Sequence, residues 1–524
     1  MRILKRVHFH PFLMGIFPVI SLYASNQSQL GAAAPWRSLA VILAGTVIVF
    51  VLLRWIVGDW TRAGFITTFA SFLFFIYGPI KVFISLKNSQ YAGLNGGLGH
   101  YLLPALFAIL AAGIWLLVWK IPHEETSLLI FNVIAIATLI LPVISIASYS
   151  LSHARGAAVG QSKAPARARL AAQPDIYYII LDMYGRSDTI EDKYGFDNSA
   201  FLAELRKQGF YVAACSSSNY TQTALSLASS LNMDYLTAYG KKFAPGKPYR
   251  DDAGNLIKDS TVRQYLAQYG YKFVSFENRF SFINITNSDV FIRMPNSELT
   301  IQPFELLLIE QTPAIVVLNE LEKIAAAHKV EDLRKYGSVY DATQYVLNAM
   351  TRLPTSIQSP KFVYVHLVIP HPPYVIGPNG EYTGDSENLT GGTDGGPINL
   401  QAEKLGYTNQ VKYLNSRMPK IVAQIIATSK NPPVIIIQGD HGFKAWNDGT
   451  DRLAILNAYY LPGKDASKLL YQSITPVNSF RMVLDAYFNG QFKLLPDLNY
   501  LSDNSKGLFD AALYPNQSIA CQAK

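Results

Sequence analysis

Apolar residues are concentrated at one end of this chain. They form long uninterrupted stretches before residue 150, whereas charged, polar and apolar residues alternate from about Asp175 onward. One helical crossing of a bilayer core needs about 20 consecutive apolar residues. Half of the 524 residues are hydrophobic and only 16% are charged, a balance too apolar for an ordinary soluble protein. The sequence therefore predicts a membrane half followed by a globular half.

The membrane half, residues 1–150, is predicted to be an all-helical bundle with about five spans. The candidate spans lie near residues 9–24, 38–57, 64–84, 100–119 and 127–149. The first one is short and follows a basic start, so it could instead be a signal peptide. Either interpretation places the second half outside the cytoplasm if the chain starts inside. The basic residues that follow the last span, from Arg155 to Arg169, oppose this orientation under the positive-inside rule.

The globular half, residues 175–524, follows a linker at 151–174 that is rich in Ala, Arg and Gly. Continuous apolar and β-branched runs predict buried strands, and helical patterns lie between them. The strand patterns occupy 176–185, 362–370 and 433–442, and the helical patterns 199–208, 261–268, 304–327, 403–428 and 477–488. This alternation predicts an α/β domain with a mostly parallel sheet covered by helices on both faces. In such sheets, ligands bind beyond the carboxyl ends of the strands.

Potential metal ligands follow the predicted strands. Asp182 comes after IYYIIL, His371 after VHLVIP, and the pair Asp440-His441 after VIIIQG. A single aspartate at a strand end is usually a turn former or a helix cap. Several carboxylates and imidazoles at one sheet edge are instead the ligand set of a divalent ion.

The segment YTQTALSLASSL, residues 220–231, places hydroxyl groups before a helical pattern. If the helix begins near Thr223, this hydroxyl lies at the positive end of the helix dipole, where free N–H groups bind phosphate or sulfate. A threonine becomes a strong nucleophile only when a base or a metal lowers its pKa. Thr223 could thus be a cap, a nucleophile or both, and Thr221 is the competing candidate.

Five weaker candidates flank these motifs. Lys444 and Arg452 follow Asp-His-Gly and could neutralise a phosphate, although surface placement is the ordinary expectation for such residues. Asn219 precedes the helix, where it could bind substrate or serve as a cap. Arg186 and Asp188 could contact substrate, but a turn is favoured.

The motifs together resemble the alkaline phosphatase superfamily. They are Asp182, Thr-Ala-x-Ser-Leu at 223–227, His-x-x-x-x-His-x-Pro at 366–373 and Asp-His-Gly at 440–442. Their order is similar to that of the sulfatase-like, membrane-anchored branch, which includes the lipoteichoic acid synthases and the phosphoethanolamine transferases. The resemblance implies that Thr223 is the nucleophile, that Asp182, Thr223, Asp440 and His441 hold a metal, and that His371 and His366 contact the transferred group. It also implies an alkaline phosphatase-like fold.

Two departures from the family pattern matter. No histidine follows His441, so one divalent ion, Zn or Mn, is expected rather than a complete second metal site. The sulfatase motif C/S-x-P/A-x-R is absent around Thr223, so cleavage of sulfate esters is disfavoured.

The resemblance implies a transferase. Such an enzyme would move a phosphoethanolamine-type or phosphoglycerol-type headgroup from a membrane phospholipid to an envelope glycan or glycolipid. A phosphodiesterase or phosphatase of the same fold is one alternative, and a non-catalytic lipid-binding regulatory protein is another. The net charge of +8 suits a protein beside anionic lipid, and no nucleic acid partner is expected.

The resemblance also implies a multi-pass protein of the bacterial cytoplasmic membrane whose catalytic half faces the periplasm or cell exterior. In an oxidising compartment, Cys215 and Cys521 would form a disulfide if their Cα atoms come close enough. Two unrelated buried thiols are the alternative.

Overall fold

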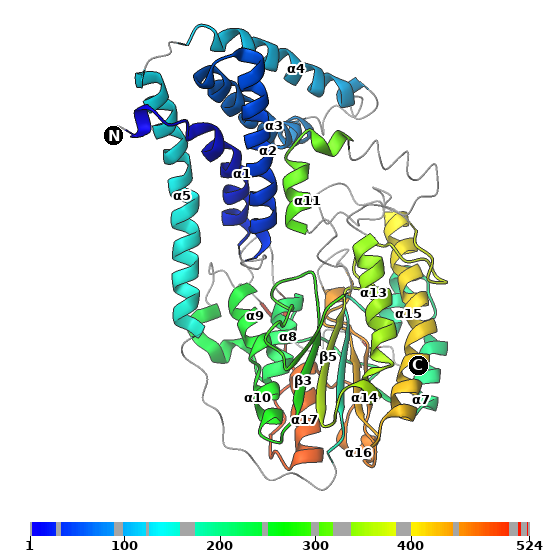
Figure 1. The fold of residues 1–524 in the computed structure, drawn as a ribbon. Coiled ribbons are helices and arrows are strands. Elements are labelled where there is room, and N and C mark those ends of the chain that lie inside the picture. The colour runs from blue at the N-terminus through cyan, green and yellow to red at the C-terminus, as the bar shows by residue number, and fades with distance from the viewer. Residues whose placement is uncertain are drawn as a thin grey trace. The chain divides into compact units, whose positions relative to one another are not determined.

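The computed structural model describes residues 3–27, 33–87, 98–121, 125–157, 173–243, 250–294, 303–317, 337–383, 400–443, 450–501, 512–514 and 521. The chain forms two compact units, Met1–Ser162 with Ile301–Lys335 and Lys163–Thr300 with Tyr336–Lys524. The first unit is helical, and the second contains the sheet (Figure 1).

The first unit has a helix at each predicted span. Its elements are η1 (Ile3–Lys5), α1 (His10–Asn26), α2 (Ala34–Val57), α3 (Trp60–Lys87), α4 (Leu98–Val118), α5 (Glu125–Ala157) and α11 (Pro303–Glu310). Over the described residues, three helices are long and apolar enough to cross a membrane: Ala34–Val57, Trp60–Ile80 and Glu125–Leu151. Crossings by α1, which has 17 residues, and by α4 stay predictions.

Helices α1 and α5 run parallel. At their beginnings, the backbone N–H groups of Phe9 and His10 donate to Oδ1 of Asn132 at 3.0 and 2.8 Å. At the end of α1, the side-chain amide of Gln27 donates to the Ser145 hydroxyl at 3.1 Å. Because contacts advance in the same direction along both helices, the end of α5 points the same way as the end of α1.

Helix α11 comes from the second half of the sequence but packs within the first unit. Phe304 lies in a buried cluster with side chains of α1 and α3, and the Arg37 guanidinium donates to the Glu305 carboxylate. Just beyond α11, the carbonyl of Gln311 accepts from the backbone N–H of Gly78 at 3.0 Å. A Cβ at Gly78 would lie 2.5 Å from the Cα of Gln311, so only glycine allows this approach. The sequence predicts a helix at 304–327 but gives no sign of this partner, and residues 318–336 lie outside the described part.

The second unit is built on a seven-stranded sheet with the order β2-β7-β6-β1-β5-β3-β4. The strands are β1 (Ile176–Leu181), β2 (Tyr211–Val212), β3 (Lys272–Phe276), β4 (Val290–Ile292), β5 (Lys361–Leu367), β6 (Val434–Gln438) and β7 (Asn457–Tyr460). Neighbouring strands from β6 to β4 pair parallel, and β7 pairs antiparallel with both β6 and β2. The predicted mostly parallel sheet is confirmed. Strands β8 (Asn499–Leu501) and β9 (Ala512–Tyr514) form a separate pair.

Helices cover both faces of the sheet, as predicted. Alternate residues of β1 enter different cores, because successive side chains of a strand point to opposite faces: Tyr178 and Ile180 lie in one cluster, Ile179 and Leu181 in the other. The first face packs against α8 (Thr223–Asn232), α9 (Arg250–Lys258), α10 (Thr261–Ala267) and α17 (Pro476–Phe488). The second packs against α6 (Ser187–Tyr194), α7 (Ser199–Lys207), α13 (Gly337–Met350) and α15 (Leu400–Thr428). Short elements are η3 (Leu236–Phe243), α14 (Leu353–Ser356), η5 (Thr450–Arg452) and α16 (Ala466–Leu469).

A buried ion pair fastens the amino ends of the central strands. Nζ of Lys361 lies 2.5 Å from Oδ2 of Asp175, and their side chains are 0% and 4% exposed. Oδ1 of Asp175 accepts from the backbone N–H of Lys361 at 3.0 Å. Its carbonyl accepts from the N–H of Val434 at 2.8 Å. These bonds link β1, β5 and β6 at one edge.

The predicted disulfide between Cys215 and Cys521 is confirmed. The two Cα atoms lie 5.4 Å apart across a sequence separation of 306 residues. The bond fastens Cys521 to the segment that follows β2.

Candidate active site

The carboxyl end of β1 carries a strained residue. Asp182 donates its backbone N–H to the carbonyl of Leu367 at 3.0 Å, which continues the pairing with β5. The next residue, Met183, has φ of 66°, in the left-handed region that side chains other than glycine rarely adopt. Its N–H donates to Oδ1 of Asp440 at 3.1 Å, and its carbonyl accepts from the Tyr407 hydroxyl at 3.0 Å. Such strain persists only where the surroundings hold it, commonly at functional sites.

Four buried side chains meet at this edge of the sheet: Asp182, His366, Asp440 and His441. Nε2 of His441 lies 3.7 Å from Oδ1 of Asp182 and 3.6 Å from Oδ2 of Asp440. Nε2 of His366 lies 3.7 Å from Oδ2 of Asp182 and 4.0 Å from Oδ2 of Asp440. Each of these side chains is at most 2% exposed. The sequence places His366 at the substrate, but the structure brings it among the candidate metal ligands.

Several atoms of this cluster lack a hydrogen-bond partner among the described residues. They are Oδ1 of Asp182, Oδ2 of Asp440 and both ring nitrogens of His366. In His441, Nδ1 bonds the carbonyl of Gly442 at 2.8 Å, which turns Nε2 toward the cluster. Buried polar atoms without partners are costly and rare. Asp182, His366 and Asp440 offer ligand atoms that all lie within 4.8 Å of one another, so the cluster fits a divalent metal ion.

The ionisation of the two carboxyl groups fits the same interpretation. Burial raises the pKa of Asp182 well above its usual value, and the charge of Asp440 raises it further. Burial also opposes ionisation of Asp440, but His441, His366 and the Thr223 hydroxyl together outweigh burial and lower the pKa of Asp440. Burial lowers the pKa of His441 to about 4, so this imidazole is neutral at pH 7, the form that binds metals. A divalent ion would therefore compete with a proton for the Asp182 carboxyl group.

Thr223 is the first residue of α8, and its hydroxyl touches the cluster. Oγ1 lies 3.2 Å from Nε2 of His441. One helical turn later, the Ser226 hydroxyl donates to the carbonyl of Asp440 at 2.6 Å, which fastens the start of α8 to the ligand loop. This contact explains the spacing of Thr and Ser in Thr-Ala-x-Ser. The competing Thr221 takes part through its backbone carbonyl, which accepts from Nε of Arg452 at 3.0 Å.

His371 lies beside the cluster and is partly exposed. Its backbone N–H donates to the carbonyl of Asp182 at 3.1 Å. Nδ1 bonds the carbonyl of Pro372 at 2.5 Å, so Nε2 is left to act on a substrate. Burial lowers the pKa of His371 to about 4, although the bond to Pro372 opposes this shift. The imidazole is therefore neutral at pH 7.

Asn219 does not reach the cluster. Its side-chain amide donates to the Thr475 hydroxyl at 3.0 Å and to the carbonyl of Leu498 at 2.9 Å. Its Oδ1 accepts from the N–H of Val477 at 2.8 Å, at the start of α17. Because these bonds occupy both ends of a fully buried amide, Asn219 holds α17 in place rather than facing a substrate.

Arg452, expected on the surface, lies against the site instead. Its backbone carbonyl accepts from the N–H of Gly442 at 2.7 Å, and its side chain is only partly exposed. Burial and Asp440 raise the pKa of Asp182, and the charge of Arg452 offsets part of this rise. Nothing in the sequence separates Arg452 from a surface arginine, because its place depends on how the chain returns after Asp-His-Gly. Lys444 lies outside the described residues.

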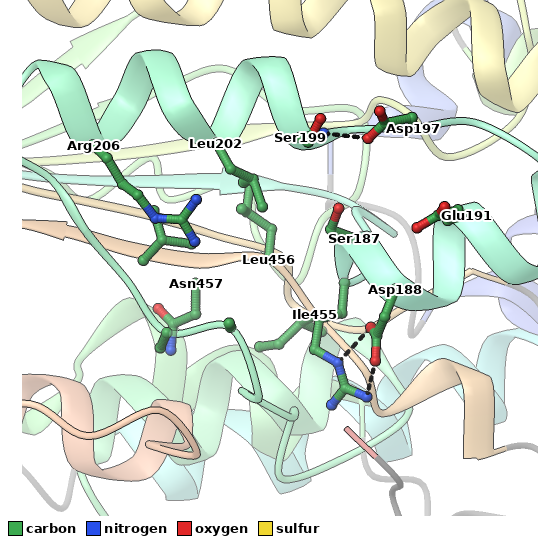
Figure 2. A pocket seen from close by; sticks show the side chains of 14 residues that line it. Ser187, Asp188, Glu191, Asp197, Ser199, Leu202, Arg206, Ile455, Leu456 and Asn457 are labelled. Atoms are coloured by element: carbon green, nitrogen blue, oxygen red, sulfur yellow. Dashed lines mark hydrogen bonds and ion pairs between the residues drawn. The ribbon is translucent and has the colours of Figure 1, made fainter. Parts of the chain in front are cut away.

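A cavity of about 250 Å³ lies between α6, α7 and the start of β7 (Figure 2). It is lined by Arg186, Ser187, Asp188, Glu191, Asp197, Ser199, Leu202, Arg206, Val212, Ala213, Ala214, Ile455, Leu456 and Asn457. Nε of Arg186 lies 2.7 Å from Oδ1 of Asp188, which fits the local turn favoured for this pair. Of the candidates named from the sequence, only Arg186 and Asp188 line this cavity; the expected metal ligands and Thr223 do not.

The sheet, its helices and the cluster at the strand ends define an α/β protein with a candidate metal centre at the carboxyl ends of its parallel strands. The model of the sulfatase family matches residues 174–472. The chain therefore belongs to the sulfatase family, a family of enzymes.

Three solved structures show how far the similarity extends. The C-terminal periplasmic domain of EcEptC from Escherichia coli, in complex with Zn, is 12% identical and covers 66% of this chain and 94% of its own, with a TM-score of 0.42. The integral membrane lipooligosaccharide phosphoethanolamine transferase A from Neisseria meningitidis is 12% identical and covers 94% and 96%, with a TM-score of 0.39. The phosphonate monoester hydrolase of Agrobacterium radiobacter is 12% identical and covers 64% and 82%, with a TM-score of 0.36. No curated protein matches the chain significantly.

Proposed function

We propose that this protein is a membrane-anchored, metal-dependent transferase that moves a phospho-headgroup from a phospholipid to a glycan or glycolipid through a phospho-Thr223 intermediate. The headgroup is of the phosphoethanolamine or phosphoglycerol type. The observation that carries this proposal is the Thr223 hydroxyl at the start of α8, 3.2 Å from His441 and beside two buried carboxylates that each have one oxygen without a partner among the described residues.

Asp182, Asp440, His441 and Thr223 would hold the metal, with His366 as a further ligand. A divalent ion there, Zn or Mn, would lower the pKa of the Thr223 hydroxyl and offset charge on the phosphoryl oxygens. The first N–H groups of α8 have no partners within the helix, so they favour an anion on Thr223. Buried carboxylate and imidazole atoms without partners lower the stability of a protein unless they bind an ion, which argues against a protein that merely binds lipid.

In the first step, Oγ of Thr223 loses its proton to solvent and attacks phosphorus, and the bond from phosphorus to the diacylglycerol oxygen breaks. His371 enters neutral, takes a proton from solvent as the anionic headgroup raises its pKa, and gives this proton to the leaving oxygen. In the second step, an acceptor hydroxyl gives its proton to His371 and attacks phosphorus, and the bond to Oγ breaks. Oγ then regains a proton from solvent, and His371 releases its proton to solvent.

Residues around Thr223 support phosphate rather than sulfate chemistry. Sulfatases of this family use a modified Cys or Ser in the motif C/S-x-P/A-x-R. Here the nucleophile position is a threonine, and Leu225 and Leu227 stand where the motif has Pro/Ala and Arg.

Helix directions and the disulfide support a location outside the cytoplasm for the second unit. Because α1 and α5 run parallel, a chain that starts inside leaves the membrane outside, in a bacterial periplasm or at the cell exterior. A disulfide such as Cys215–Cys521 persists in oxidising compartments. The membrane helices would keep the site near its lipid donor and raise the donor's effective concentration.

Mass spectrometry of Thr223 tests the proposal. The full-length protein would be incubated with zinc or manganese and with vesicles of phosphatidylethanolamine or phosphatidylglycerol, and the mass of the adduct would identify the headgroup. The adduct is expected to disappear when a glycan acceptor is added and to be absent from Thr223→Ala. Headgroup release that is equally fast with and without an acceptor would identify a hydrolase, and a protein without metal under metal-replete conditions would favour the lipid-binding alternative.

A further inference from the structure

We infer that Arg452 binds the nonbridging oxygens of the phospho-group and sets the substrate class of this site as a phosphodiester with one negative charge. This inference rests on the proposed function and adds a substrate-binding residue to it.

The backbone of Arg452 is fixed against the ligand loop. Its carbonyl accepts from the N–H of Gly442, the residue after His441, at 2.7 Å. A Cβ at Gly442 would lie 2.2 Å from the carbonyl oxygen of Asp451 and 2.7 Å from that of Ala454, so only glycine lets the two segments approach this closely. Arg452 is therefore held next to the residues that would bind the metal.

The side chain of Arg452 reaches the loop of the nucleophile. Nε donates to the carbonyl of Thr221, two residues before Thr223, at 3.0 Å. One bond thus fixes the guanidinium between the helix that carries the nucleophile and the loop that carries the ligands.

The other two nitrogens of this guanidinium remain open. Within the described residues, they make no hydrogen bond or ion pair, even though the charge of Arg452 acts on Asp182 and Asp440. Arg186 differs, since its Nε and one terminal nitrogen bond Asp188 and its other terminal nitrogen bonds the carbonyl of Ser216. Two parallel N–H donors on a planar fork match two oxygens of a phosphate.

The charges of the site select a diester. As metal ligands, Asp182 and Asp440 contribute two negative charges, and a divalent ion balances them. At pH 7, the imidazoles of His366 and His441 would be neutral as metal ligands and add no charge. Arg452 then supplies one positive charge in excess, which equals the single negative charge of a phosphodiester. A phosphomonoester at the same pH carries a second charge with no counterpart.

Arg452→Ala and Arg452→Lys in the full-length, metal-loaded protein test this inference. The substrates are bis(4-nitrophenyl) phosphate, a diester, and 4-nitrophenyl phosphate, a monoester with the same leaving group. Wild type is expected to prefer the diester. Arg452→Ala should lower kcat/KM for the diester by about 10²–10³-fold, the usual cost of one donor to developing negative charge. Arg452→Lys should retain part of the activity, and added guanidinium should partly rescue Arg452→Ala.

Arg481→Ala is the matched control. Nε of Arg481 also donates to a backbone carbonyl, that of Met233 at 2.7 Å, but its partners lie outside the cluster. Metal content and Tm should be the same in Arg452→Ala and Arg481→Ala. An Arg452→Ala protein that turns over the diester as fast as Arg481→Ala, or that loses its metal, would overturn the inference.

A binding measurement separates this inference from the proposed reaction. Diphenyl phosphate, a diester that carries one charge, would be titrated into each variant and followed by phosphorus NMR. Wild type and Thr223→Ala should both bind it, and Arg452→Ala should bind at least about tenfold more weakly, since a charge-assisted hydrogen bond is among the strong ones. If Thr223→Ala keeps full turnover, the phospho-threonine route fails, while unchanged binding by Arg452→Ala refutes the role of Arg452.

Discussion

The two ends of the central strands both bury charge, but they do so in opposite ways. At the amino end, Asp175 and Lys361 satisfy each other and the surrounding backbone. At the carboxyl end, Asp182 and Asp440 lie near each other with one oxygen each left without a partner. The comparison indicates that a buried charged group with all its hydrogen bonds made stabilises the fold, whereas one with an unpaired oxygen marks a ligand-binding site.

The largest expected effect is the loss of catalysis when the nucleophile at the carboxyl end of the strands is removed. Thr223→Ala should lower headgroup transfer by ~10⁴–10⁶-fold, the scale of losing a nucleophile. Metal content should change little, because Asp182, Asp440 and His441 remain. Thr223→Ser retains a hydroxyl and serves as the control. Transfer of labelled headgroup measures the effect, and wild-type rates in Thr223→Ala would exclude the covalent route.

The next largest effect is a loss of stability when the ion pair at the amino end of the strands is broken. Lys361→Met leaves the buried carboxylate of Asp175 unpaired and should destabilise the protein by about 3–5 kcal/mol. Thermal unfolding of the detergent-solubilised protein measures this loss. Adding Asp175→Asn to Lys361→Met should recover part of it, because the unpaired charge is then removed. Equal stability of wild type and Lys361→Met would refute the structural role of the pair.

Removal of the metal should affect stability through the carboxyl end alone. A ligand present at 100 times its Kd stabilises a folded protein by about 2.7 kcal/mol. Chelation should therefore lower the Tm of wild type and of Lys361→Met by similar amounts. In Asp182→Asn, which lacks one ligand, the same treatment should change the Tm much less. A Tm shift of wild-type size in that variant would place the metal elsewhere.

The smallest expected effect is the pH dependence of stability and of metal affinity. Since the folded state raises the pKa of Asp182, the metal-free site holds a proton at pH values where a free aspartate has lost it. Metal-free stability from this group is thus present at low pH and is lost as pH rises through the raised pKa. Metal binding expels the proton, so affinity should increase with pH, by up to about tenfold per unit for one proton.

Calorimetry of metal binding in two buffers with different ionisation enthalpies counts the released protons. His441 should contribute only near its pKa of about 4. Asp182→Asn should release fewer protons than wild type, and an equal count would assign the proton to another group.

Much of the site was predictable because local patterns encode it. Apolar runs end at Asp182 and Asp440, and the ends of parallel strands meet at one edge whatever the rest of the fold does. The place of His366 was harder to predict. It lies opposite Ile180 in the pairing of β1 with β5, and a sequence without a known register does not say which residues share a face.

The residues that sequence reasoning misplaced depend on contacts between distant segments. Arg452 meets Thr221 and Asn219 meets Thr475 across more than 200 positions, and no periodicity reports such partners. The helical fold of 303–310 was predictable from its pattern, but its packing against α1, α2 and α3 was not.

That packing has a practical consequence for anyone who wants the enzymatic half by itself. A truncated protein that begins at Asp175 would retain Phe304 and Leu308 but lack Val19 and Phe75, which cover them. In such a fragment, the apolar side chains of α11 are exposed to water, and the fragment is expected to self-associate. Deletion of Ile301–Lys335 together with the amino-terminal helices is therefore the better route to a fragment that stays monomeric in solution.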